Sequence, residues 1–203
     1  DQELLASDAD YCLSAEILKS ELQEQLDTFF QFHKIEVVID PDLIAKLKGN
    51  CAIGHNRYAT TGETMLRNVQ PLYADLAFGG FTVAHNGNLT NAMTLRSELV
   101  TQGSIFQSTS DTEVIIHLVA LSRKPTVFDR IIDALRTIEG AYSLIIHAEG
   151  RMIGVRDPNG FRPLILGKLD NSYVLASETC ALDIIGADYV RDIEPGEVVV
   201  ITE

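Results

Sequence analysis

The sequence predicts an α+β layered domain, and two observations support this fold class. From residue 51 onward, short apolar segments alternate with turn signals such as EG, LDN and DPNG, a pattern typical of strands joined by hairpins. Helical patterns enter in blocks between these strands instead of following each strand. Blocks of helices among hairpin-connected strands favour an α+β domain over a doubly wound parallel sheet.

The beginning of the chain predicts a helical segment that differs from the rest. Apolar residues recur at steps of three and four between Ile17 and Phe30, so they share one face of an amphipathic helix. The organisation changes after Gly49, where strand patterns begin to dominate. We therefore expect residues 1–48 to be an atypical helical N-terminal segment and residues 49–203 to be the main domain.

The main domain is predicted to consist of strands around two helical blocks. Apolar runs predict strands in CAIGHNRYAT, FGGFTVAHN, AYSLIIHAE, RMIGVRD, RPLILGKL, SYVLAS and EVVVITE. The first helical block covers residues 91–103, and the second covers residues 111–124 and 126–140. No internal repeat or low-complexity linker divides this region, so we expect one domain.

Composition and charge exclude several classes of function. The 203 residues carry a formal net charge of −13, which repels a phosphate backbone, so nucleic acid is not an expected partner. No apolar run approaches the roughly 20 residues that cross a bilayer, so we expect no membrane partner and a cytoplasmic location. Three cysteines without CxxC spacing predict neither a disulfide framework nor a zinc site. No P-loop is present, and we expect no cofactor in this chain.

Polar residues and glycines gather where the predicted strands end, as is typical of functional sites. Four runs show this feature: GHNRYATTG (54–62), AHNGNL (84–89), QSTSDTE (107–113) and VRDPNGFRPL (155–164). In the first run, the guanidinium of Arg57 and the hydroxyl of Thr60 form a group able to hold a carboxylate. A surface ion pair at Arg57 is the alternative that the residues alone leave open.

In the second run, a predicted strand leads into Asn86 and Gly87. A glycine N–H beside an asparagine amide is one way to build an oxyanion hole, where a single donor contributes on the order of 10²- to 10³-fold in rate. Asn-Gly is also the strongest short hairpin signal, so a hairpin turn is the alternative.

In the third run, Asp111 stands where a Ser/Thr-rich loop becomes a helix. This is a usual N-cap position, although a carboxylate there is also able to receive a substrate ammonium group. Glu113 and His117 lie four residues apart on the same helix, but no third histidine is near in sequence, so a metal site is not expected.

Taken together, these runs resemble one family, the N-terminal class II glutamine amidotransferase domain of amidophosphoribosyltransferase. The resemblance rests on GHNRYATTG, RNVQP, AHNGNL, GSIFQSTSDTE, GAYSL, VRDPNGFRPL and ASETCALDIIGADYVRDIEPGE. Relatives that aminate other substrates share the first two motifs more loosely, whereas the last two favour the purine enzyme.

The resemblance implies both a fold and an activity. The fold is a four-layer αββα sandwich of the N-terminal-nucleophile hydrolase type, with two antiparallel sheets. The activity is hydrolysis of glutamine to glutamate, which supplies ammonia for phosphoribosylamine formation in de novo purine biosynthesis. Glutamine is thus the implied ligand. In the full-length family, a phosphoribosyltransferase domain or homo-oligomer partners accompany the glutaminase domain.

The resemblance also implies a role for individual residues. Arg57 is expected to bind the α-carboxylate of glutamine and Asp111 its α-amino group, while Thr60 shapes the pocket. Asn86 and the N–H of Gly87 are expected to stabilise the tetrahedral oxyanion.

The cysteines need separate treatment, because the family's nucleophile is a cysteine at residue one of the mature chain. Its free α-amino group, with a pKa of about 7.7 to 8.0, suits proton transfer near neutral pH. Residues 1–48 show no such start and no His-Arg-Gly loop, so Cys12, exposed by removal of a propeptide, is the only candidate nucleophile. We expect Cys180 to be buried and inert, and Cys51 to begin a core strand.

Two hypotheses about function follow from this departure. The first is a working glutaminase domain, which requires a cysteine nucleophile at the N-terminus. The second is a non-catalytic glutamine-binding or interaction module that kept the pocket and lost the reaction. No segment resembles the phosphoribosyl pyrophosphate loop of the partner domain, so we expect the phosphoribosyltransferase domain to be absent from this chain.

Overall fold

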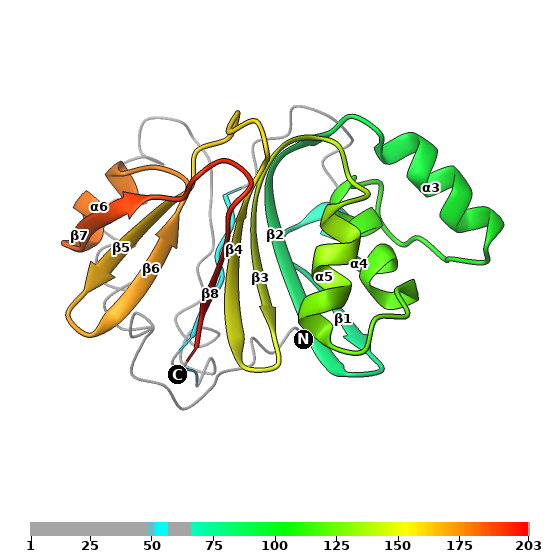
Figure 1. The fold of residues 1–203 in the computed structure, drawn as a ribbon, viewed down its shortest axis with the longest axis horizontal. Helices are drawn as coiled ribbons and strands as arrows, with labels where there is room; N and C mark the ends of the chain where they lie inside the picture. Colours follow the sequence, from blue (N-terminus) through cyan, green and yellow to red (C-terminus); the bar gives the residue numbers. More distant parts are fainter. Residues whose placement is uncertain (1–48, 50, 57–65, 203) are drawn as a thin grey trace. The chain divides into compact units, whose positions relative to one another are not determined.

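The computed structural model of the protein describes residues 49, 51–56 and 66–202, drawn in colour in Figure 1. The predicted N-terminal helix lies outside these residues. The described chain divides into two compact units. The larger unit comprises residues 53–164 and 193–202, and the regular structure of the smaller one lies within residues 165–192.

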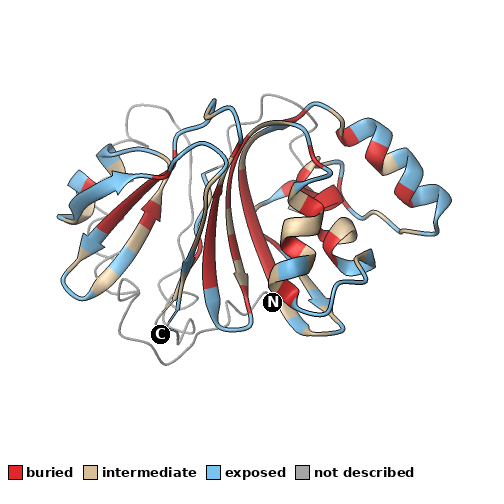
Figure 2. Cartoon of the chain, viewed as in Figure 1, coloured by how far each residue is buried: buried red, intermediate tan, exposed pale blue. Residues whose placement is uncertain are grey.

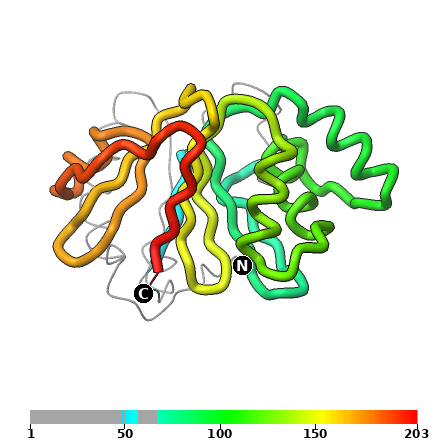
Figure 3. Tube along the Cα trace, viewed as in Figure 1, coloured from blue at the N-terminus to red at the C-terminus, as the bar shows by residue number. Residues whose placement is uncertain are grey.

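The larger unit is built on a five-stranded antiparallel sheet with the order β1-β2-β3-β4-β8. Its elements in chain order are η1 (Leu66–Asn68), β1 (Leu72–Leu76), β2 (Gly79–Leu89), α3 (Ala92–Thr101), α4 (Thr112–Leu121), α5 (Val127–Leu135), β3 (Gly140–Ala148), β4 (Arg151–Arg156) and β8 (Val198–Ile201). Helix α4 packs against β1 and β2, and α5 packs against α4. Figure 3 shows β8 running beside β4, although residues 157–197 separate the two strands in sequence.

The core of the larger unit lies on the face of the sheet that α4 covers. Cross-strand partners on this face include Val83 and Ile146, and Leu144 lies beside them; all three are fully buried. Ile115 of α4 and Ile131 of α5 are also fully buried in the same cluster. Burying one such side chain stabilises the fold by about 1.5 to 3 kcal/mol. Figure 2 shows the buried residues gathered along β2, β3 and β4.

The smaller unit contains a three-stranded antiparallel sheet with the order β6-β5-β7. Its elements are β5 (Ile165–Leu169), β6 (Ser172–Ala176), α6 (Cys180–Ile185) and β7 (Asp188–Asp192). A Cβ on Gly167 would lie 2.5 Å from a methyl carbon of Leu182. The glycine therefore allows α6 to pack closely on β5.

The predicted α+β class and the three predicted helices of the main domain are confirmed, as α3, α4 and α5. Strands β1 and β7 and helix α6 were not predicted. Every residue of β7 is exposed, so the strand has no alternation of polar and apolar residues that a sequence pattern would reveal. Across the described part of the chain, no helix is both long enough and apolar enough to cross a membrane.

Candidate active site at the edge of strand β2

Asn86 and Gly87 lie inside strand β2 and not in a turn. The strand pairs with β3 through both residues, Asn86 opposite Ser143 and Gly87 opposite Tyr142. The hairpin alternative is therefore wrong. A turn would have satisfied the backbone hydrogen-bonding groups of Asn86 and Gly87 locally, but here they lie in a strand that pairs with β3.

Two glycines let β2 and β3 approach closely at this point. Gly87 has φ +149°, and a Cβ there would lie 2.0 Å from the carbonyl oxygen of Ala141. Gly140 has φ +141°, and a Cβ there would lie 2.3 Å from the carbonyl oxygen of Asn88. Contacts this short are forbidden to real side chains, so both positions require glycine.

Within the described strands, the second half of β2 has one neighbour instead of two. Strand β1 pairs with β2 only as far as Val83, whereas β3 pairs with it as far as Leu89. Among the described residues, the backbone groups on that side of β2 have no ladder partner beyond Val83, so side chains and ligands are able to bind them there.

Two side chains occupy this edge, one on each side of Gly87. The N–H of His85 donates to Oε1 of Gln70 at 2.6 Å, and the N–H of Leu89 donates to Oδ2 of Asp111 at 2.9 Å. Alternate residues of an antiparallel strand direct their N–H groups to the same side. We therefore expect the N–H of Gly87 to face the same edge, between the Gln70 and Asp111 side chains.

Asp111 occupies the N-cap position of α4, but its side chain makes no capping hydrogen bond. Its carboxylate reaches across to β2, where Oδ1 lies 3.7 Å from Nδ1 of His85, and a quarter of the side chain (25%) remains exposed. Burial raises the pKa of Asp111, but interactions with His85 and the N–H groups of Leu89 and Thr112 outweigh it, so the net pKa is lowered. The carboxylate is thus ionised at neutral pH and partly open to a cation.

His85 connects the strand to its surroundings through both backbone and side chain. Its buried ring places Nδ1 3.1 Å from the hydroxyl of Thr112. Its carbonyl oxygen accepts from Nε2 of Gln70 at 3.2 Å and lies 3.0 Å from Nε2 of His55. Contacts with Gln70, His55 and Thr112 therefore fix the position of His85, the residue that precedes Asn86.

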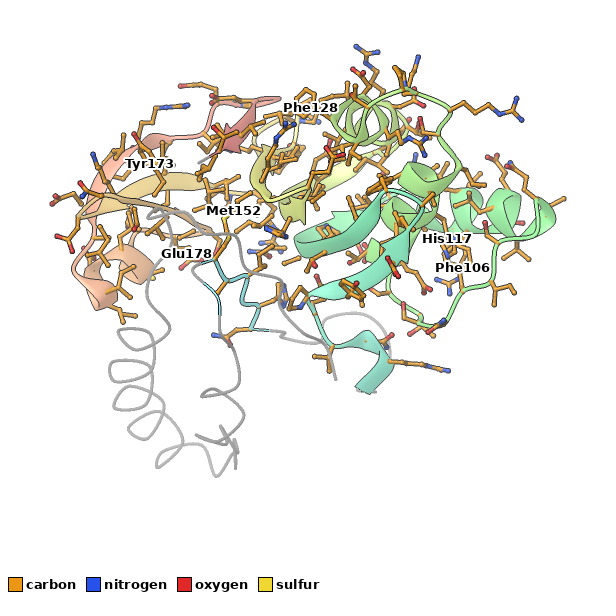
Figure 4. The ribbon with its side chains drawn as sticks, turned by 90° about the horizontal axis from the view of Figure 1, so that it is seen from below. Phe106, His117, Phe128, Met152, Tyr173 and Glu178 are labelled. Atoms are coloured by element: carbon orange, nitrogen blue, oxygen red, sulfur yellow. The ribbon has the colours of Figure 1, made fainter. Side chains whose placement is uncertain are left out.

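Glu113 anchors the loop that leads to Asp111. Its two carboxylate oxygens accept the N–H groups of Gln107 and Ser108, each at 2.7 Å. Nε2 of His117 lies 3.8 Å from Oε1 of Glu113, and the ring centroids of His117 and Phe106 are 4.2 Å apart. Figure 4 labels both rings. Burial lowers the pKa of His117, although Glu113 opposes this shift. In the described ranges, no group of three or more His, Cys, Asp or Glu side chains could hold a metal ion.

The VRDPNGFRPL run forms a turn around the buried carboxylate of Asp157. This side chain accepts N–H groups from Asn159 (3.0 Å), Phe161 (3.1 Å), Arg162 (2.9 Å) and Tyr142 (3.3 Å). Burial raises the pKa of Asp157, but these four hydrogen bonds lower it further than burial raises it. Since Tyr142 is the cross-strand partner of Gly87, the turn also anchors β3 behind the candidate site.

Three of the residues predicted for the site, Arg57, Thr60 and Cys12, lie outside the described residues. Of the others, the structure places Asn86, Gly87 and Asp111 together at one end of β2. Sequence reasoning missed Gln70, although it belongs to the quoted RNVQP motif, because a hydrogen bond from a side chain to a distant backbone leaves no periodic pattern.

The prediction of a buried Cys180 is wrong. Cys180 begins the surface helix α6, in which only Leu182 is buried, and its thiol lies 3.6 Å from a carboxylate oxygen of Glu178. The prediction that Cys51 begins a core strand is also wrong, since residues 51–56 form no strand and Cys51 is half-buried.

Comparisons with known proteins give a consistent family. A family described as glutamine amidotransferase domain matches residues 55–183. Amidophosphoribosyltransferase of Rhizobium etli is 51% identical over 176 residues, which cover 85% of this chain and 36% of the relative. The enzyme of the same name from Bacillus subtilis is 49% identical over 161 residues, covering 79% of this chain and 34% of the relative.

Solved structures agree with these relatives. One described as the allosteric regulatory enzyme of purine biosynthesis has a TM-score of 0.78 and 48% identity, covering 82% of this chain and 36% of its own. Glutamine phosphoribosylpyrophosphate amidotransferase from B. subtilis, complexed with ADP and GMP, has a TM-score of 0.74 and 48% identity, covering 79% and 34%. The likeness confirms the predicted N-terminal-nucleophile fold class. The chain spans only about a third of the length of these proteins.

Proposed function

The chain belongs to the glutamine amidotransferase domain family, and from this premise we propose that it is the glutaminase domain of an amidophosphoribosyltransferase. In this function the domain binds glutamine and hydrolyses the side-chain amide to glutamate. The ammonia passes to a phosphoribosyltransferase domain, which forms phosphoribosylamine in de novo purine biosynthesis. That domain and further copies of the chain are the proposed partners of the full-length protein.

The spacing of groups along the open edge of β2 carries the proposal. The carboxylate of Asp111 is fixed at Leu89, two residues beyond Gly87. Two residues of a strand span about 7 Å. The α-amino nitrogen and the side-chain oxygen of glutamine are separated by five bonds, or about 6 Å when extended. An ammonium at Asp111 therefore brings the amide of glutamine toward Gly87.

At that end of the substrate, Asn86 and Gly87 are proposed to form the oxyanion hole. The side chain of Asn86 is half-buried and makes no hydrogen bond to another described residue, so its amide is available to a ligand. The N–H of Gly87 adds a rigid backbone donor, which costs little reorganisation as charge develops on the substrate oxygen. Arg57 is proposed to bind the α-carboxylate, beside Thr60.

The proposed reaction uses a cysteine thiol, for which Cys12 is the candidate in this sequence. The α-amino group of the nucleophile takes the thiol proton, and the sulfur attacks the amide carbon. The tetrahedral oxyanion then collapses: the proton moves to the leaving nitrogen, the carbon–nitrogen bond breaks and ammonia departs. Water cleaves the resulting thioester, which releases glutamate and restores the thiol.

Calorimetric titration of the purified chain tests the binding part of this proposal. We expect saturable binding of L-glutamine and at least tenfold weaker binding of L-asparagine, whose shorter side chain does not span the two ends of the site. Asp111→Asn is expected to weaken glutamine binding, and Asp75→Asn, a change at an exposed carboxylate of β1, provides the matched control. Absence of glutamine binding would overturn the proposal.

A glutamine analogue that alkylates catalytic cysteines tests the chemical part. The intact mass of the wild-type chain is expected to increase by one adduct, and Cys12→Ala is expected to prevent it. An adduct that survives in Cys12→Ala would assign the thiol to another cysteine. Glutamine binding without any adduct would instead support a non-catalytic glutamine-binding module.

A further inference from the structure

Two carboxamide side chains come from the last residue of η1 and from the short segment that joins it to β1. Asn68 is fully buried and Gln70 is half-buried. A carboxamide carries an acceptor oxygen beside a donor NH₂ group, so it is able to hold two polar groups of another residue at once. Both side chains do so here, each on a different part of the candidate site.

Gln70 holds the backbone of His85. Its Oε1 accepts the N–H of His85 at 2.6 Å, and its Nε2 donates to the carbonyl of His85 at 3.2 Å. A residue on a neighbouring antiparallel strand would exchange the same pair of hydrogen bonds. The main chain itself stops short of this, because the described β1–β2 ladder ends at the Leu72–Val83 pair. The side chain of Gln70 thus continues the ladder to the residue that precedes Asn86.

Asn68 holds the loop that precedes Asp111. Its Oδ1 accepts the N–H of Thr109 at 2.9 Å, and its Nδ2 donates to the hydroxyl of Thr109 at 2.8 Å. Thr109 lies two residues before Asp111, whose carboxylate is bound to the far end of β2. Asn68 therefore fixes the loop from which that carboxylate is presented.

We propose that Asn68 and Gln70 are a pair of positioning residues, each of which acts mainly on one end of the glutamine site. Gln70 fixes the oxyanion end through His85, and Asn68 fixes the ammonium end through Thr109. This inference rests on the proposed glutamine site. Displacement of a catalytic group by about 1 Å can cost on the order of 100-fold in rate, so residues that do not touch the substrate still control the reaction.

Amide NMR spectra of the full chain separate the two ends. Gln70→Met removes both hydrogen bonds to His85 and keeps a side chain of similar length. It is expected to shift the amide resonances of His85 and Gly87 and to leave that of Asp111 in place. Asn68→Leu is expected to shift the amide resonance of Asp111 and to leave that of Gly87 in place. Gln102→Met, at an exposed glutamine that ends α3, is the matched control and is expected to shift none of these.

Glutamine binding gives the second readout. Asn68→Leu is expected to weaken it by about tenfold or more, because the ammonium partner is displaced. Gln70→Met is expected to leave the dissociation constant within about threefold and to lower the rate of the amide reaction, since an oxyanion donor acts mainly in the transition state. Because Asn68 is fully buried, the milder Thr109→Val change serves as a second variant. It removes the hydroxyl partner from an exposed position.

The outcomes distinguish the inference from the function on which it rests. A wild-type chain that does not bind glutamine refutes the proposed function. A wild-type chain that binds glutamine, with variants that shift both ends equally or neither end, refutes the separate roles of Asn68 and Gln70 and leaves the function intact. Reciprocal shifts, with weaker binding only in Asn68→Leu and Thr109→Val, support the inference.

Discussion

Replacement of Gly87 by alanine tests the architecture of the site at its most constrained point. The new Cβ would lie 2.0 Å from the carbonyl oxygen of Ala141 and 2.8 Å from Cα of Tyr142, both of which are backbone atoms of β3. Neither atom is able to move aside as a flexible side chain would. Strand β3 therefore has to shift by about 1 Å or more, against an interstrand spacing of about 4.8 Å.

Two terms contribute to the expected loss of stability. Overpacking of a tight site costs about 1 to 3 kcal/mol, and an L-residue at a strained φ adds about 1 to 3 kcal/mol. We expect Gly87→Ala to lower the free energy of unfolding by about 2 to 6 kcal/mol. The displaced backbone N–H should also abolish the proposed glutaminase reaction.

Gly79→Ala separates the two terms within the same strand. Gly79 has φ +108°, but a Cβ there would meet nothing within 4 Å, so this variant reports the cost of the backbone conformation alone. Urea unfolding followed by circular dichroism measures both variants. The difference between them is expected to be about 1 to 3 kcal/mol. Equal losses in the two variants would refute the close approach of β2 and β3 at Gly87.

Further predictions follow from three titratable side chains, those of Asp157, Asp111 and His147. Asp157→Asn should lower the free energy of unfolding by about 2 to 4 kcal/mol in urea, because an amide NH₂ replaces an acceptor of backbone N–H groups. Asp111→Asn should raise the dissociation constant for glutamine by on the order of 10- to 100-fold, measured by calorimetry. Because the pKa of Asp111 is lowered, the wild-type affinity should persist as the pH falls toward 4 and be lost only below the ordinary carboxyl range. Burial lowers the pKa of His147 in the folded state. As the pH drops below about 6.5, the unfolded chain therefore binds a proton at His147 before the folded chain does, and the free energy of unfolding should fall. His147→Gln should flatten that part of the pH profile. A profile that His147→Gln leaves unchanged would contradict this assignment.

The sequence motifs predicted the residues of the candidate site better than they predicted the geometry. Asn86, Gly87 and Asp111 were all expected to contribute, and the structure brings them to one end of β2. Yet the local signal at Asn86-Gly87 favours a hairpin, and the strand forms there only because β3 pairs with it across the whole motif. The pairing of β2 with β3 therefore outweighs the local preference of Asn-Gly for a turn.

The supporting residues could not have been predicted from patterns. Gln70 reaches His85 across fifteen positions, and Asn68 reaches Thr109 across forty-one. Such bonds depend on a ladder that ends at Val83 and on a loop held by Glu113, neither of which has a sequence period. A side chain that completes a backbone ladder is visible only once the strands are in place.

Release of glutamate and ammonia by the purified chain tests the central claim most directly. The account predicts saturable release of both products in equal amounts from L-glutamine, none from D-glutamine, and a strong loss in Asp111→Asn at low substrate concentration. Glutamine that binds at the edge of β2 without any release of ammonia would contradict the proposed glutaminase reaction and leave only a binding module.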